Sequence, residues 1–308
     1  MMRLVFMGTP HAAVPTLERL IADGYEIAAV YTQPDRPSGR GQRLTASPVK
    51  QVALEHGLEI RQPLKIKPDE AFGEFRSLDA DAAIVVAYGR ILPERWLTAF
   101  PSGAINVHFS LLPKYRGAAP VNWAIVNGET ETGVTTMQMD AGLDTGNILL
   151  QQNLSIGEVE NAIDLMDRLA EIGADLLVQT LASLDTIGPK AQDDSLATFA
   201  PIMKKEDGLI DWRMSAFQVA DRVRGFQPFP TSFTFHDGKR LTIWKAFAMD
   251  AGAVEAGVIQ DAGENLVIGC GESSVLLIEE LQPEGKRRLS VRDYLNGAKL
   301  AVGEKFGI

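Results

Sequence analysis

The sequence of 308 residues has little cysteine and little histidine. Its single cysteine, Cys270, excludes an internal disulfide and is typical of a protein from a reducing compartment. The four histidines (His11, His56, His108 and His236) show no spacing typical of a metal site, so no metal is expected. No apolar run approaches the roughly 18 residues that a membrane span requires. We therefore expect no contact with a membrane.

Charge and the opening residues narrow the class of protein further. The formal net charge of −10 argues mildly against a nucleic-acid partner, although local basic patches rather than the total attract polyanions. The opening MMRLVFMGTP lacks the longer apolar region and the small-residue cleavage site of a secretory signal. Hydrophobic residues make up 45% of the chain, and its length fits two domains. We expect a cytoplasmic, monomeric globular protein.

The first part of the chain alternates β-rich and helical patterns. Apolar β-rich runs cover residues 3–7, 26–31, 81–89, 103–109 and 133–139. Helical patterns cover residues 14–21, 47–57, 118–128 and 162–184. Strands that alternate with helices are typical of a doubly wound, mostly parallel sheet. We predict this Rossmann-like α/β fold for residues 1–188.

The pattern changes after Leu184. A polar, proline-containing stretch at residues 189–208 is predicted to be a linker. Beyond residue 209, one helical pattern is followed by short β-like runs, and Asp237-Gly238 between two of them is a strong hairpin signal. Short strands at this spacing predict a small β-barrel domain over residues 209–308.

Two short stretches carry the candidate chemistry. Asn106, His108 and Ser110 occupy alternate positions, so in a strand they share one face, near the sheet edge where ligands bind in such folds. Capping of neighbouring loops would explain the Asn and the His about as well. Asp140 and Asp144 lie in the glycine-rich loop MDAGLDTGN, where backbone hydrogen bonding is the commoner reason for an aspartate.

Transfer of an acyl group to an amine accounts for this set of residues. An amide can donate to the oxyanion that forms when an amine attacks a carbonyl, and loss of such a donor raises the barrier by about 3–4 kcal/mol. An imidazole can move the amine proton or share the negative charge, and a nearby carboxylate favours the charged imidazole. No serine lies in a nucleophile elbow, and Cys270 is far along the chain. We therefore expect direct transfer without a covalent enzyme intermediate.

The stretch NVHFSLLPKYRGAAPVNWAIVNGETETGVTTMQMDAGLDTG resembles the signature of folate-dependent formyltransferases. The resemblance implies that Asn106, His108 and Asp144 are catalytic, and that 10-formyltetrahydrofolate donates the formyl group without a metal. The segment VVAYGRILP also resembles that family, where its Tyr-Gly loop lies beside the pterin. The folate-binding residues that the resemblance implies are Ser110, Leu111, Leu112, Pro113, Tyr88, Gly89 and Asp140.

Three further features resemble the methionyl-tRNA formyltransferases within that family. The opening FMGTPHAAVPTLERL is similar, except that His11-Ala12 replaces an acidic residue and Phe. Residues 33–50 are arginine-rich, and that branch carries a basic insertion here, although composition alone favours a solvated loop. The stretches ATFAPIMKKEDGLIDW and RVRGFQPFPTSFT resemble the linker and the start of a C-terminal barrel similar to an OB fold.

The resemblance implies that initiator methionyl-tRNA is the acceptor. The implied tRNA-binding residues are Arg36, Arg40, Arg43, Lys204 and Lys205. Further cations of the C-terminal domain are expected on a tRNA-facing surface: Arg222, Arg224, Lys239, Arg240, Lys245 and residues 286–288. Acidic residues nearly balance them, so binding requires that the two signs be segregated.

Two alternatives stay open at this point. An amino-sugar nucleotide N-formyltransferase would use the same folate donor and catalytic domain but would not need the basic loop. A non-catalytic folate- or RNA-binding protein with a decayed site belongs to another class, and the intact Asn106, His108 and Asp144 argue against it. The identity of the acceptor amine distinguishes a methionyl-tRNA formyltransferase from an amino-sugar formyltransferase. Measurable turnover distinguishes either enzyme from a non-catalytic binding protein.

Overall fold

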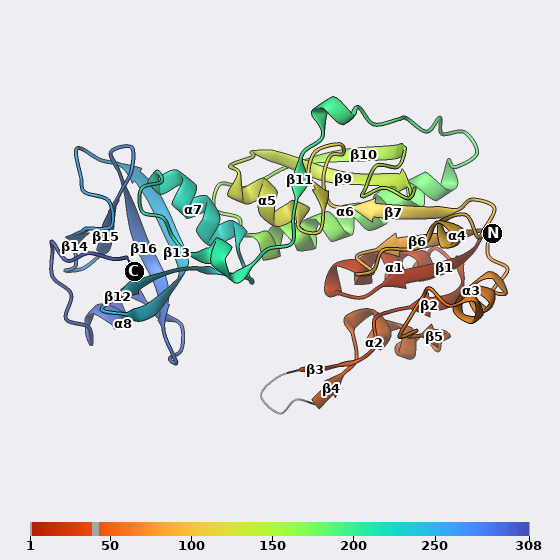
Figure 1. The fold of residues 1–308 in the computed structure, drawn as a ribbon, viewed down its shortest axis with the longest axis horizontal. Coiled ribbons are helices and arrows are strands. Elements are labelled where there is room, and N and C mark those ends of the chain that lie inside the picture. The colour runs from red at the N-terminus through yellow and green to blue at the C-terminus, as the bar shows by residue number, and fades with distance from the viewer. Residues whose placement is uncertain (1, 39–42, 308) are drawn as a thin grey trace. The chain divides into compact units, whose positions relative to one another are not determined.

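The computed structural model describes residues 2–38 and 43–307, and the chain forms two compact units (Figure 1). The first unit comprises Met1–Pro120, Glu131–Ser155 and Met166–Ala200. The second comprises Val121–Thr130, Ile156–Leu165 and Pro201–Ile308. The predicted linker contains the change from one unit to the other, and its predicted boundaries at residues 188 and 208 stay a prediction.

A seven-stranded sheet forms the centre of the first unit. Its strands are β1 (Arg3–Gly8), β2 (Glu26–Tyr31), β5 (Ile60–Arg61), β6 (Ala82–Val86), β7 (Ala104–His108), β9 (Glu131–Gln138) and β10 (Ile148–Ser155). Their order is β10-β9-β7-β6-β1-β2-β5. The five strands from β7 to β5 pair in parallel, and β9 pairs antiparallel with both β7 and β10. The prediction of a mostly parallel α/β sheet is confirmed.

The helical patterns at residues 14–21, 47–57 and 162–184 are confirmed, whereas no pattern predicted the short helices at residues 94–97 and 194–196. Those of the first unit include η1 (His11–Ala13), α1 (Val14–Ala22), α2 (Pro48–Glu55), α3 (Asp69–Arg76), α4 (Glu94–Leu97) and η2 (Asp194–Leu196), and α6 (Ala162–Ala182) lies mostly within it. α2 begins after Ser47, whose hydroxyl accepts a hydrogen bond from the Lys50 backbone N–H. Tyr31, Phe75 and Trp96 form an aromatic core, and Tyr88 belongs to the same buried cluster. This core supports the loop that follows β6.

Residues 33–50, predicted as one long loop, contain a short hairpin. β3 (Arg36–Ser38) pairs antiparallel with β4 (Arg43–Thr45), and the hairpin projects from its neighbours in Figure 1. At its base, Lys50 Nζ lies 2.6 Å from Asp35 Oδ2 and 2.8 Å from Gln62 Oε1. The hydrogen bonds that Asp35 accepts from Lys50 and, at 2.9 Å, from Gln62 Nε2 hold the pKa of its carboxyl below its usual range. Three-residue strands carry no detectable period, which is why the sequence pattern did not show them.

An antiparallel sheet forms the second unit. Its strands are β12 (Ser232–His236), β13 (Lys239–Asp250), β14 (Ile259–Asp261), β15 (Leu266–Cys270), β16 (Ser274–Pro283) and β17 (Leu289–Ser290). Their order is β12-β13-β16-β15-β14, and β17 pairs with β16. Asp237 and Gly238 have φ values of +50° and +70°, as the predicted two-residue hairpin requires.

The C-terminal segment joins the two edges of this sheet. Gly307 bridges to Phe235 of β12, and Lys305 bridges to Val258 next to β14. The sheet therefore closes on itself, and the predicted small barrel is confirmed. Helices of this unit include α5 (Pro120–Val126), η3 (Lys205–Gly208), α7 (Ala216–Gly225) and α8 (Val291–Leu295). Within the described ranges, no helix combines the length and the apolarity that crossing a bilayer demands.

The single cysteine gives a test of this core. Cys270 is 1% exposed, and burial raises the pKa of its thiol to about 12. Because the thiolate is the reactive form, we expect the folded protein to react with a disulfide reagent near pH 8 on the order of 1,000-fold more slowly than the unfolded chain. Release of the coloured thiol with and without guanidinium measures this. Rapid stoichiometric labelling of the folded protein would contradict the burial.

Candidate active site

Asn106 and His108 lie on β7, a central strand of the first unit. Because they are two positions apart, their side chains share one face of the sheet. β6 pairs with this strand on one side and β9 on the other, with Met137 opposite Asn106 and Thr135 opposite His108. The backbone pairing therefore fixes both side chains at the carboxyl end of a central strand, where doubly wound sheets bind ligands.

The His108 ring is held at one nitrogen and left open at the other. Its Nε2 lies 3.0 Å from the carbonyl oxygen of Tyr115, and because a carbonyl only accepts, this nitrogen carries a proton. Nδ1 makes no hydrogen bond with any described residue, and it lies 3.8 Å from Oδ2 of Asp144. The side chain is 7% exposed. Nδ1 is thus the ring nitrogen that can meet a reacting group.

Asp144 is fixed by the same turn that orients His108. Its Oδ2 accepts a 2.8 Å hydrogen bond from the backbone N–H of Gly117. Its backbone is left-handed, with φ +53°, a conformation that few residues other than glycine adopt. Tyr115 and Gly117 therefore hold the imidazole and the carboxylate from one stretch of chain. The structure brings these two predicted residues together.

The Asn106 side chain has a buried end without a protein partner. Its Oδ1 has no hydrogen-bond partner among the described residues. The nitrogen and oxygen of an amide exchange places by a flip, so this end can present either a donor or an acceptor. Unpaired buried polar atoms are rare in native proteins and call for a ligand or a water. Asn106 thus has a hydrogen-bonding group available to a substrate.

The residues from Ser110 to Pro113 form the turn after β7. Ser110 Oγ donates to the Lys114 carbonyl at 2.7 Å, and the Leu112 N–H donates to Thr135 Oγ1 at 3.1 Å. The Leu112–Pro113 peptide is cis. These polar groups brace the turn, whereas the half-buried Leu111 and Pro113 offer an apolar contact surface.

A pocket of about 370 Å³ lies at the carboxyl ends of β1, β2 and β6. The Tyr88 carbonyl accepts hydrogen bonds from Thr9 Oγ1 and Gln33 Nε2, both at 3.1 Å. The pocket is lined by Thr9, Pro10, Gln33, Pro34, Arg36, Ser47, Ala87, Tyr88 and Gly89. Tyr88 and Gly89, which were predicted to bind folate, therefore line the same pocket as Arg36, which was predicted to bind tRNA. Its volume falls in the range of small-molecule sites.

Asp140 stabilises the loop that carries Asp144. This exposed carboxylate accepts hydrogen bonds from the Gly142 N–H at 3.0 Å and from Thr145 Oγ1 at 2.7 Å. Both bonds lie within the loop, as expected for an aspartate in a turn. Its predicted contact with folate stays a prediction.

The predicted tRNA-binding residues fall in two places. Arg36 is exposed on β3, and Arg43 lies on β4 paired with Ser38. Arg40 lies outside the described residues. Lys204 and Lys205 are exposed at the start of η3 in the second unit.

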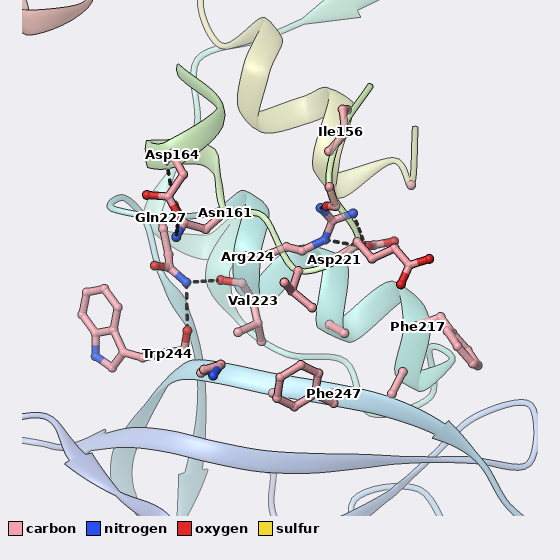
Figure 2. A pocket seen from close by; sticks show the side chains of 18 of the residues that line it. Ile156, Asn161, Asp164, Phe217, Asp221, Val223, Arg224, Gln227, Trp244 and Phe247 are labelled. Carbon is pink, nitrogen blue, oxygen red and sulfur yellow. Dashed lines mark hydrogen bonds and ion pairs between the residues drawn. The ribbon is translucent and has the colours of Figure 1, made fainter. Parts of the chain in front are cut away.

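Several other cations of the second unit are engaged within the protein. A pocket of about 710 Å³ there has Arg224, Lys245 and Arg288 in its lining, beside Trp244 and Phe247 (Figure 2). Arg224 forms an ion pair with Asp221, Lys245 with Glu279, and Arg288 with Glu280. Arg222 donates to the Asp207 carbonyl and stacks on Phe226. Because Arg224, Lys245 and Arg288 are each paired with a carboxylate, this pocket is a poor site for a phosphate chain.

The residues that support the turn at residues 115–117, here called the catalytic turn, were not predicted from the sequence. Thr198 bonds to Tyr115 of the turn, Gln192 bonds to the loop of Asp144, and Arg116, within the turn, bonds to Gln192. Gln192 and Thr198 lie in the polar stretch predicted as a linker, where no spacing or motif distinguishes them. Within the described part of the chain, no group of three or more His, Cys, Asp or Glu is arranged to hold a metal ion.

Both halves of the chain match known families. Residues 2–181 match the family described as Formyl transferase, and residues 202–299 match Formyl transferase, C-terminal domain. The fold and the site thus belong to a formyl transferase. A methionyl-tRNA formyltransferase of Solibacter usitatus is 51% identical over 308 residues, covering 99% of each chain. One of Geobacter metallireducens is 48% identical over 306 residues, covering 99% of this chain and 98% of the relative.

These full-length relatives establish the branch: the chain belongs to the methionyl-tRNA formyltransferases, as the sequence predicted. A solved structure of more distant sequence shares the fold. The N-formyltransferase of Helicobacter canadensis, in complex with folinic acid and dTDP-3-aminofucose, superposes with a TM-score of 0.71 at 20% identity. The match covers 92% of this chain and all of that one.

The catalytic turn has one position that tolerates only glycine. Gly117 has φ +124°, and a Cβ there would lie 2.6 Å from the Ala200 carbonyl oxygen. We expect Gly117→Ala to destabilise the fold by about 1–3 kcal/mol and to lower formyl transfer, because the N–H that binds Asp144 must move. Thermal melting and initial rates measure the two effects.

A matched control is Gly57→Ala. Gly57 also has a positive φ, +64°, but nothing lies within 4 Å of the added carbon. We expect a small loss of stability and the rate of the unmodified protein. Equal effects of the two substitutions on rate would contradict a special role for Gly117.

Proposed function

We propose that this protein transfers the formyl group of 10-formyltetrahydrofolate to the α-amino group of methionine on initiator methionyl-tRNA. The observation that carries the proposal is the 51% identity, over 99% of both chains, to a methionyl-tRNA formyltransferase. The contact of His108 with Asp144, on the strand that also carries Asn106, supports the chemistry. Blocking the amine removes its charge and marks the product for initiation.

In the proposed reaction Asn106, His108 and Asp144 have different roles. The folate derivative, when bound, supplies the formyl carbon that the amine attacks; the bond from this carbon to N10 of the folate then breaks, and tetrahydrofolate leaves with N10 carrying the proton that the amine gives up. Asn106 donates a hydrogen bond to the oxygen that gains negative charge, since its buried amide end has no competing partner among the described residues. His108, oriented through the Tyr115 carbonyl, directs Nδ1 to the same reaction centre. Asp144 stabilises the imidazolium and helps to take up the amine proton.

The residues near this centre suit a folate. Leu111 and Pro113 offer half-buried apolar surface at the end of β7. Tyr88 and Gly89 line a pocket of mixed apolar and polar walls, where the Tyr88 carbonyl accepts hydrogen bonds from Thr9 and Gln33. An aromatic, partly polar ring system needs this mixture of apolar walls and a few polar groups.

The acceptor is the second half of the proposal. Arg36 is exposed, lies on the projecting hairpin and lines the pocket of Tyr88, so one side chain can contact phosphate near the site. Lys204 and Lys205 are exposed in the second unit. An amino-sugar nucleotide is the alternative acceptor, because the Helicobacter canadensis protein of the same fold binds one. At 20% identity that likeness supports the fold alone.

Removing either polar partner of the reaction tests the chemistry. We expect Asn106→Ala and His108→Ala each to lower kcat on the order of 100- to 1,000-fold, because each removes a group that acts on the developing charge. His236→Ala is the matched control, since His236 is a half-buried histidine with a carboxylate partner, Glu304 at 3.0 Å. Single-turnover rates with formyl-folate and methionyl-tRNA measure the loss. Transfer by His108→Ala at the unmodified rate would remove the catalytic assignment.

A panel of acceptors tests the substrate. We expect formylation of methionyl-tRNA but neither of an amino-sugar nucleotide nor of glycinamide ribonucleotide. Rising salt should raise KM for the tRNA, because phosphate contacts release counterions, and Arg36→Ala should reduce that salt dependence. Turnover of the sugar nucleotide alone, with no effect of Arg36→Ala, would move the assignment to the alternative.

A further inference from the structure

We infer that residues 192–200 are a positioning element of the active site, in which Gln192 and Thr198 hold the two loops that carry the His108–Asp144 contact. The sequence pattern describes this segment only as polar linker. The inference rests on the proposed function, since it assigns the segment a role in that reaction. The side chains of Gln192 and Thr198 bond to Tyr115, Arg116 and the loop of Asp144 rather than to a predicted substrate-binding residue, so both are positioning residues.

Gln192 uses both ends of its side-chain amide. Its Nε2 donates to the carbonyl oxygens of Asp144 and Gly146, at 2.8 and 2.7 Å. Its Oε1 accepts from Nε and Nη2 of Arg116, at 3.0 and 2.8 Å. The amide thereby joins the loop of Asp144 to the catalytic turn, and both of its donor hydrogens are engaged.

Arg116 fixes the connection that Gln192 makes between the catalytic turn and the loop of Asp144. Its side chain is 4% exposed and is further bound by Asp194 Oδ1 at 2.7 Å. A buried guanidinium without partners is strongly disfavoured, so these bonds keep it in one geometry. Arg116 stands between Tyr115, whose carbonyl orients His108, and Gly117, whose N–H binds Asp144. Any movement of the guanidinium is thus passed to both members of the contact.

Thr198 and the strand that follows it hold the backbone of the same turn. The Tyr115 N–H donates to Thr198 Oγ1 at 2.9 Å, and the Arg116 N–H donates to the Thr198 carbonyl at 2.9 Å. β11 (Phe199–Ala200) then pairs in parallel with β8 (Arg116–Gly117). Tyr115 has φ +59°, a conformation that costs on the order of 1–3 kcal/mol and persists only where surrounding bonds enforce it.

The consequence for catalysis is geometric. The 3.8 Å separation of His108 Nδ1 from Asp144 Oδ2 is set by a turn and a loop that meet through Gln192 and Thr198. A misplacement of about 1 Å in a catalytic group can cost on the order of 100-fold in rate. Loss of either residue should therefore lower kcat and leave KM for both substrates unchanged.

Gln192→Met tests the element directly, because methionine keeps the length of the side chain and removes all four hydrogen bonds. We expect kcat to fall at least about 10-fold with KM within about 2-fold of the unmodified protein. Gln260→Met is the matched control: Gln260 is also a half-buried amide that donates to a backbone carbonyl, that of Val258 at 3.1 Å, but in the second unit. We expect this control to keep the unmodified kcat.

Thr198 gives a second, independent variant. Thr198→Val keeps the shape and removes the hydroxyl that accepts from Tyr115, whereas Thr198→Ser retains it. We expect kcat to fall in the valine variant and to be restored in the serine variant. Equal rates for valine and serine would show that the hydroxyl does not position the turn.

A double-mutant cycle separates positioning from general destabilisation. If Gln192 acts through the His108–Asp144 contact, Gln192→Met should change the residual kcat by less than about 2-fold in the combined background of His108→Ala and Asp144→Asn. A multiplicative effect in that background, or an unmodified kcat in Gln192→Met alone, would overturn the inference.

The ring ¹⁵N chemical shifts of His108 report on the position of the imidazole without depending on which acceptor the protein uses. They should change in Gln192→Met and not in Gln260→Met, whichever acceptor the protein uses. Unchanged shifts in Gln192→Met would refute the positioning element even in an active enzyme. Altered shifts in a protein that does not formylate methionyl-tRNA would refute only the proposed acceptor.

Discussion

The contact between His108 and Asp144 is the interaction on which the arrangement of the site depends. It joins a residue on the central strand β7 to a residue in a glycine-rich loop after β9. Both partners are bound by one short turn, His108 through the Tyr115 carbonyl and Asp144 through the Gly117 N–H. This turn therefore sets the relative positions of His108 and Asp144. Residues distant in sequence affect these positions when they bind the turn.

Part of the positive charge predicted for tRNA binding is paired with carboxylates within the protein. The net charge is −10, and Arg224, Lys245 and Arg288 of the second unit all have acidic partners. Exposed cations remain on β3 (Arg36), at the start of η3 (Lys204 and Lys205) and elsewhere in the second unit (Lys239, Lys286 and Arg287). In the proposed function, these exposed cations supply the phosphate contacts, since the domain as a whole is not strongly basic.

Local patterns in the sequence predicted the sheet and the site strand well. β6 is apolar along its whole length, and Asp237-Gly238 has the φ values of its turn, so the residues themselves specify these features. The alternation of Asn106 and His108 placed both on one face for the same reason. The bonds of Gln192 and the pairing of β8 with β11 were not predicted, because two-residue strands have no period and long-range side-chain bonds leave no spacing to detect.

The account's central claim is that the imidazole and the carboxylate act as one unit on one carbonyl. Single-turnover formyl transfer by His108→Ala, Asp144→Asn and the double variant tests this most directly. Residues that act as a unit are strongly non-additive, so the account predicts that the double variant is no slower than His108→Ala alone. A double variant whose loss equals the product of the two single losses would contradict it.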